Sequence, residues 1–108
     1  TIVQVSNTTP TNVANTTNFQ LSGRDGTSLK YGGLLDEVGF WLGTELTSVQ
    51  ASAIYNSGTP ASLSAYSPTS WWRNGDGDTY PTITDNGSGG NNGTMTNMVS
   101  GDIVTDVP

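Results

Sequence analysis

The chain contains neither cysteine nor histidine. Without cysteine, no disulfide can stabilise the fold and no thiol can act as a nucleophile. Without histidine, the chain lacks the commonest general base, the commonest zinc ligand and any Ser-His or Cys-His pair. We therefore expect that this protein is not an enzyme.

Basic side chains are also scarce. Three Lys and Arg residues stand against nine Asp and Glu, and the formal net charge is −6. Binding to nucleic acid or to an anionic membrane surface requires clustered basic residues, but Arg24, Lys30 and Arg73 lie far apart in the sequence. No apolar run is long enough to cross a bilayer. The sequence therefore predicts no nucleic-acid partner and no membrane span.

Hydrophobic residues make up only 32% of the 108 residues, which is low for a globular core. Thr, Ser, Asn and Gly supply about half of the chain and favour turns and short strands. This composition is typical of secreted or virion β proteins, so we expect a place on a virion surface or outside the cell. So small a core needs support from an oligomer interface, a bound metal or the rest of a longer polypeptide.

Residues 34–42 give the strongest strand signal. Alternation along this run places Val38, Phe40 and Leu42 on one face. We predict that these three side chains are buried, together with Ile54 of the helix that follows.

The helix is predicted near residues 47–56. Thr47 and Gln50 have the spacing of a capping box, in which each residue's side chain bonds the other's backbone N–H. Gly58 is expected to end the helix. Its inner stripe is expected to consist of Val49, Ala53 and Ile54.

Two segments resemble the laminin-G-like, concanavalin A-like jelly-roll family. Residues 18–58, with Asp36-Glu37-Val38 before a strand and Tyr55-Asn56-Ser57-Gly58 at a helix end, are similar to the closing part of such a unit. The run that starts at Trp71-Trp72-Arg73-Asn74-Gly75-Asp76 and continues to Gly93-Thr94-Met95 looks like its opening part. The resemblance implies an all-β, antiparallel, jelly-roll-like β-sandwich, whole or partial, used for binding or particle architecture.

The same resemblance suggests three parts of the chain. Residues 1–58 would supply closing strands and the helix, 59–70 a linker, and 71–108 an opening strand and a glycine-rich loop. We expect these parts to form one compact domain or a fragment of a longer chain.

An acidic cluster is the best candidate for chemistry. Asp76, Asp78 and Asp85 lie among glycines that let the backbone curl around an ion, and calcium prefers such oxygen ligands. The spacing does not complete an EF-hand. The alternative is that these aspartates bond to their own backbone in Asx turns.

Three aromatic residues are candidates for stacking on a glycan or for an interface: Trp71, Trp72 and Tyr80. Neighbours on a strand point to opposite faces, so we expect one tryptophan in the core and the other exposed or at an interface. The alternative is that the large rings are packing anchors.

Asp36 and Glu37 resemble a catalytic carboxylate pair. As strand neighbours they point to opposite faces and could not flank one glycosidic bond. In the family that the chain resembles, this pair is a structural signature, and we favour the structural interpretation.

Two functions follow from these observations. The segment from Gly93 to Pro108 looks like the closing stretch of bacteriophage structural proteins. The first hypothesis is a non-enzymatic virion protein, a capsid-decoration or fibre component that contacts its own copies or other capsid or fibre proteins. The alternative is a calcium-assisted, lectin-like module that binds cell-surface glycans for a secreted or cell-surface bacterial protein.

Overall fold

The computed structural model describes residues 18–21, 31–59 and 61–104. The chain divides into two units, Thr1–Lys30 and Tyr31–Pro108. Of the first unit only residues 18–21 are described, without regular secondary structure.

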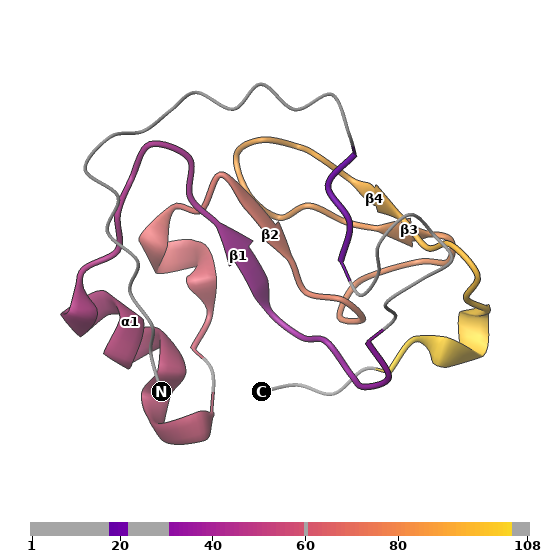
Figure 1. The fold of residues 1–108 in the computed structure, drawn as a ribbon, viewed down its shortest axis with the longest axis horizontal. Helices are drawn as coiled ribbons and strands as arrows, with labels where there is room; N and C mark the ends of the chain where they lie inside the picture. The colour runs from indigo at the N-terminus through magenta and orange to yellow at the C-terminus, as the bar shows by residue number, and fades with distance from the viewer. Residues whose placement is uncertain (1–17, 22–30, 60, 105–108) are drawn as a thin grey trace. The chain divides into compact units, whose positions relative to one another are not determined.

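The described residues of the second unit form four short strands and one α-helix (Figure 1). Strand β1 (Val38–Phe40) pairs antiparallel with β2 (Ser70–Trp72), and β3 (Thr82–Ile83) pairs antiparallel with β4 (Gly93–Thr94). The α-helix is α1 (Ser48–Tyr55). The described residues also form three 3-10 helices, η1 (Asn56–Gly58), η2 (Leu63–Tyr66) and η3 (Ser100–Asp102).

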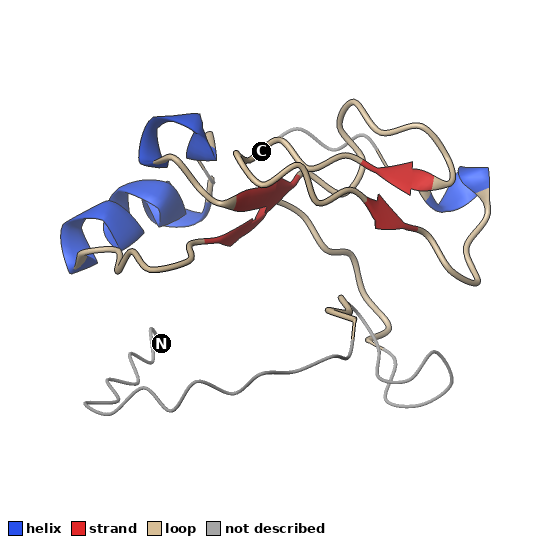
Figure 2. Cartoon of the chain, turned by 90° about the horizontal axis from the view of Figure 1, so that it is seen from above, coloured by secondary structure: helices blue, strands red, loops and turns tan. Residues whose placement is uncertain are grey.

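The β1–β2 pair occupies the middle of this unit. Val38 lies opposite Trp72, Gly39 opposite Trp71 and Phe40 opposite Ser70. Figures 1 and 2 show α1 and the β3–β4 pair on opposite sides of these two strands. Strand β2 is therefore placed to contact both the helical side of the unit and the glycine-rich loop before β4.

The capping box predicted at the start of the helix is confirmed. The Thr47 hydroxyl accepts a hydrogen bond from the Gln50 N–H, and the Gln50 side chain accepts one from the Thr47 N–H. Gly58, which was expected to end the helix, ends the 3-10 helix η1 that follows α1. The helix α1 itself lies within the predicted range 47–56, and its C-cap residue Asn56 has a left-handed φ of 41°. Asparagine tolerates this conformation better than most residues, so the glycine is not needed at that position.

Strand β1 is shorter than the predicted 34–42 run. Glu37 has a φ of 49°, which is incompatible with continued strand geometry and limits β1 at its start. This turn of the backbone accompanies the contacts of the Glu37 side chain with β2, described below.

The buried hydrophobic side chains of the described residues are Leu63, Trp71, Trp72 and Met95. The predicted core was wrong: Phe40 is 48% exposed and Leu42 73% exposed, while Val38 and Ile54 are half-buried. Val49 and Ala53 of the expected inner stripe are also exposed.

Gly39 explains why the other face of β1 is buried. A Cβ atom at Gly39 would lie 2.7 Å from Leu63 Cδ1 and 2.7 Å from the Trp41 ring. The missing side chain leaves room for both groups, so Leu63 packs against β1 on the Gly39 face. Val38 and Phe40 then point to the opposite face, because side chains alternate along a strand.

The structure confirms a small β-rich unit with one short α-helix and two small antiparallel sheets. Within the described ranges, the other helices are 3-10 segments of three or four residues. No helix in these ranges is both long and apolar enough to cross a membrane.

Two leucines provide a matched test of where the core lies. Leu63 is 2% exposed and Leu42 is 73% exposed. We expect Leu63→Ala to lower the free energy of unfolding by about 2–5 kcal/mol, because it leaves a cavity. Leu42→Ala should change it by about 0.5 kcal/mol or less. Urea unfolding at low protein concentration measures both, and equal losses would contradict the assigned core.

Candidate functional site

The Asp85 carboxylate organises the residues around β2. Its Oδ1 accepts hydrogen bonds from the backbone N–H groups of Trp71 (2.7 Å) and Gly87 (2.8 Å), and its Oδ2 accepts one from Asn91 (2.7 Å). Asp85 is only 8% exposed. One buried carboxylate thus connects strand β2 to both ends of the loop formed by residues 86–92.

Further bonds fix this loop, residues 86–92, against β2. The Asn86 N–H donates to the Trp71 carbonyl (2.7 Å), and the Trp72 indole N–H donates to the Asn91 carbonyl (2.9 Å). The Asn91 side-chain amide donates to the Ser70 hydroxyl (3.0 Å). The loop and the strand are therefore one hydrogen-bonded structure.

Two glycines allow the loop to approach this closely. A Cβ atom at Gly87 would lie 2.6 Å from both Ser70 Cα and the Thr69 carbonyl oxygen. At Gly89 it would lie 2.8 Å from the same Thr69 oxygen, which already accepts the Gly89 N–H. Any side chain at either position would push the loop away from the strand.

The environment of Asp85 favours its charged form. Burial acts to raise its pKa, but the backbone N–H groups of Trp71, Gly87 and Asn91 and a hydrogen bond with Ser70 outweigh burial, so the pKa lies below its ordinary value. A carboxylate that accepts several N–H groups in this way is held ionised and stabilises the fold at neutral pH.

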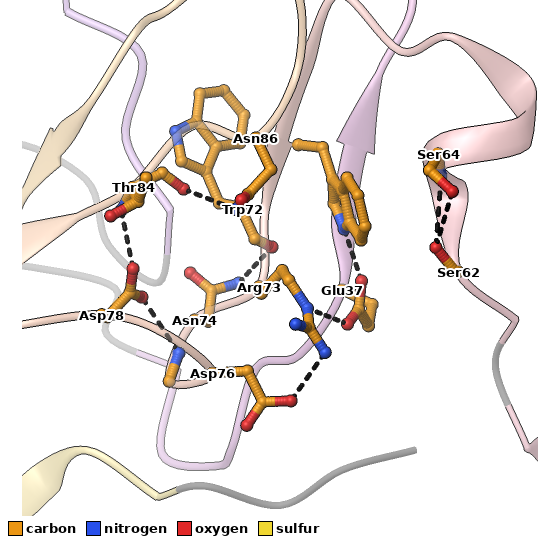
Figure 3. Close-up of polar contacts among 12 residues, drawn as sticks. Glu37, Ser62, Ser64, Trp72, Arg73, Asn74, Asp76, Asp78, Thr84 and Asn86 are labelled. Carbon is orange, nitrogen blue, oxygen red and sulfur yellow. Dashed lines mark hydrogen bonds and ion pairs between the residues drawn. The ribbon is translucent and has the colours of Figure 1, made fainter.

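A second carboxylate, that of Glu37, connects β1 to β2 (Figure 3). Glu37 Oε2 accepts the Trp71 indole N–H, and Oε1 accepts Arg73 Nε at 3.0 Å. Arg73 Nη2 also donates to Asp76 Oδ2 at 2.7 Å, and the guanidinium lies 5.7 Å from the centre of the Trp71 ring. The hydrogen bond with Glu37 is the main cause that raises the pKa of Arg73.

Asp78 holds the turn that follows β2. Its Oδ2 accepts the Gly75 N–H (3.0 Å) and its Oδ1 accepts the Thr84 N–H (2.7 Å) (Figure 3). The Asp78 N–H returns a bond to the Gly75 carbonyl (3.2 Å). A cis peptide between Tyr80 and Pro81 lies in the same connection.

The three aspartates predicted as calcium ligands have separate roles here. Asp76 pairs with Arg73, and Asp78 accepts N–H groups three residues before and six residues after it. Only Asp85, which accepts the N–H two residues on, matches the Asx-turn alternative. In the part of the chain that the structure describes, no three Asp or Glu side chains gather in a group that could hold a metal. A calcium site at Asp76, Asp78 and Asp85 stays a prediction.

The candidate aromatic residues differ in exposure. Trp71 and Trp72 are each 8% exposed, so the expectation that one of them is exposed was wrong. Each indole N–H also has an acceptor within the chain, Glu37 for Trp71 and the Asn91 carbonyl for Trp72. Tyr80 is 43% exposed, and a glycan contact at this ring stays a prediction.

Sequence reasoning missed Ser70 and the linking roles of Glu37 and Asp85. A local signal existed for Asp85, because Asp85-Asn86-Gly87 has the spacing of an Asx turn. Nothing in the sequence indicates that the same carboxylate reaches Trp71, which lies 14 residues earlier. The Glu37 contacts support the structural interpretation of the Asp36-Glu37 pair.

Comparisons with known proteins identify no relative: no family model, no curated protein and no solved structure matches this chain.

Replacing Asp85 tests its role as the organising group. In Asp85→Asn the amide NH2 must face at least one of the three backbone N–H donors, which leaves a buried donor without an acceptor. We expect a loss of about 1–3 kcal/mol in the free energy of unfolding. Asp102→Asn is the matched control, because exposed Asp102 accepts one N–H, from Val99 (2.8 Å), and should cost about 0.5 kcal/mol. Equal effects in chemical unfolding would refute the organising role.

Acid should weaken the protein through the same group. The pKa of Asp85 in the folded protein is lowered from its ordinary value of 3.8. Its contribution to the free energy of unfolding is therefore complete above pH 3.8 and is lost as the pH falls through the lower pKa of the folded state. Urea unfolding between neutral pH and about pH 2.5 measures this loss. The free energy of unfolding of Asp85→Asn should fall less steeply over the acid range than that of the wild type. Identical slopes would assign the acid sensitivity to other carboxylates.

Proposed function

We propose that the protein is a non-enzymatic structural component of a virus particle, a bacteriophage capsid-decoration or fibre protein that acts through contacts between polypeptides. Its fold in this proposal is a laminin-G-like, antiparallel β-sandwich, whole or partial. The segment resemblances described above support this fold, and the short paired strands of the second unit are compatible with it.

One observation carries the proposal: large apolar side chains are distributed mainly to the outside. The described residues bury four hydrophobic side chains, whereas many others are more than one-third exposed. Among the described residues of the second unit, the exposed set is Tyr31, Leu34, Phe40, Leu42, Val49, Tyr55, Tyr80, Met98, Val99 and Val104. Exposed apolar residues in such number favour a protein whose stability is completed by contacts with other chains.

The polar groups of the site support a structural role. Glu37, Asp78 and Asp85 use their carboxylate oxygens as acceptors for backbone or side-chain groups of the same chain. Groups committed to internal bonds in this way hold strands and loops in place. The sequence also offers no histidine or cysteine for acid–base or nucleophilic work.

Thermal unfolding can separate this function from its alternative, the calcium-assisted glycan-binding module. If contacts between chains complete the fold, the melting temperature should rise with protein concentration, because association stabilises only the folded state. A chelator should leave it unchanged. Melts at two protein concentrations, each with and without chelator, measure both effects.

The opposite result would favour the alternative. A monomer with a concentration-independent melting temperature that loses stability in chelator would contradict the proposed function. It would instead support a bound calcium ion at Asp76, Asp78 and Asp85.

A further inference from the structure

The hydrogen bonds of β2 determine which way the backbone of β1 points. The Trp71 carbonyl accepts the Asn86 N–H, and the Trp71 N–H donates to Asp85, so both polar groups of Trp71 point away from β1. Backbone groups alternate in direction along a strand, and therefore those of Ser70 and Trp72 point toward β1. The pairs Phe40–Ser70 and Val38–Trp72 are thus the hydrogen-bonded pairs of this sheet.

Gly39 consequently directs its N–H and C=O to the outer edge of β1. It lies opposite Trp71 in a non-hydrogen-bonded pair. Among the residues that the structure describes, none forms a hydrogen bond with the Gly39 backbone. Each such group on a strand edge can pair with another strand.

Two of the usual protections against strand pairing are missing from this edge. Natural edge strands are commonly protected by lysine or proline, and residues 36–42 contain neither. The outward face beside Gly39 is apolar, with half-buried Val38 and 48% exposed Phe40.

We propose that β1 pairs with β1 of a second copy of this chain, antiparallel and centred on Gly39, to form a continuous four-stranded sheet. This inference deepens the proposed function and rests on its premise that the protein works through contacts between chains. In this register Gly39 of one copy meets Gly39 of the other, and each donates to and accepts from its partner. A two-fold axis then passes between the two glycines.

The register is self-complementary, which favours a second copy over a foreign strand. With Gly39 at the centre, each Val38 lies opposite a Phe40, and both pairs fall on the same apolar face. β-Branched and aromatic residues stabilise each other as cross-strand neighbours. Strand β1 itself carries no charged side chain, and of the two acids that precede it Glu37 is paired with Arg73 of its own chain.

The absence of cysteine from the chain allows a test specific to this register. Val38 and Phe40 of the two copies would form a non-hydrogen-bonded pair with Cα atoms about 4.5 Å apart, within disulfide range. Two copies of Phe40 would lie only diagonally, about 7–8 Å apart. Full-length Val38→Cys and Phe40→Cys proteins, mixed and oxidised, should give severalfold more disulfide dimer than either variant alone.

Val49→Cys is the matched control, because Val49 is exposed on α1 and outside the proposed contact. Mixed with Phe40→Cys it should cross-link no better than Phe40→Cys alone. Equal cross-linking in all mixtures, or none in the Val38→Cys and Phe40→Cys mixture, would overturn the proposal.

The unmodified protein provides a second measurement that needs no variant. Amide hydrogen exchange at Gly39 should slow as protein concentration rises, because pairing encloses its N–H. Exchange at Gly39 that does not change while sedimentation shows a dimer would place the interface elsewhere and overturn the β1 contact. A protein that sediments as a monomer throughout would also overturn it.

The two proposals fail in distinguishable ways. A melting temperature that rises with concentration, without the register-specific cross-link, would remove the β1 contact and leave the proposed function standing. The register-specific cross-link combined with a melt that falls in chelator would retain the β1 contact and contradict the proposed function.

Discussion

The Asp85 carboxylate is the constraint on which the arrangement around β2 depends. Three backbone N–H groups, from Trp71, Gly87 and Asn91, converge on its two oxygens in a buried setting. A buried N–H without an acceptor is destabilising, so the loop 86–92 can detach from β2 only by exposing these donors to water or leaving them unpaired. The close approach that makes these bonds possible in turn requires glycine at positions 87 and 89, where a Cβ would meet the backbone of Thr69 or Ser70. The charge of Asp85, the direction of the three backbone N–H groups and the lack of a side chain at positions 87 and 89 thus all contribute to the same contact.

Glu37 holds β2 from the side of β1, and Asp85 holds it from the side of the loop 86–92. It accepts the indole N–H of Trp71 and the guanidinium of Arg73, and its side chain is only 6% exposed. The bonds fix Trp71 from two directions, since its backbone is held by Asp85 and its ring by Glu37. The few backbone hydrogen bonds of a three-residue strand fix its register only weakly, and the bonds to these two carboxylates fix it further.

The sequence was informative where the determinants were local and misleading where they were not. The Thr47–Gln50 capping box spans three residues, and its geometry follows from the helix itself, so the start of α1 could be predicted. The alternation along 34–42 correctly separated the two faces of β1, but it could not say which face is buried. That choice depends on Leu63, which lies 24 positions after Gly39 in a segment predicted as a linker, and on the space that the glycine leaves. The larger number of hydrophobic residues on the Phe40 face therefore favoured the wrong interpretation.

Gly39 also explains why the apolar outer face cannot simply turn inward. Moving β1 by one residue against β2 would reverse its faces, because side chains alternate with a period of two. Val38 or Phe40 would then have to occupy the space in which Leu63 and the Trp41 ring now lie within 2.7 Å of the position of a Gly39 Cβ. The same shift would turn Glu37 away from Trp71 and Arg73 and leave the indole N–H without its acceptor. The buried face and the exposed face of β1 are therefore set by one choice of register, and an apolar surface beside Gly39 is a direct consequence of how this core is built.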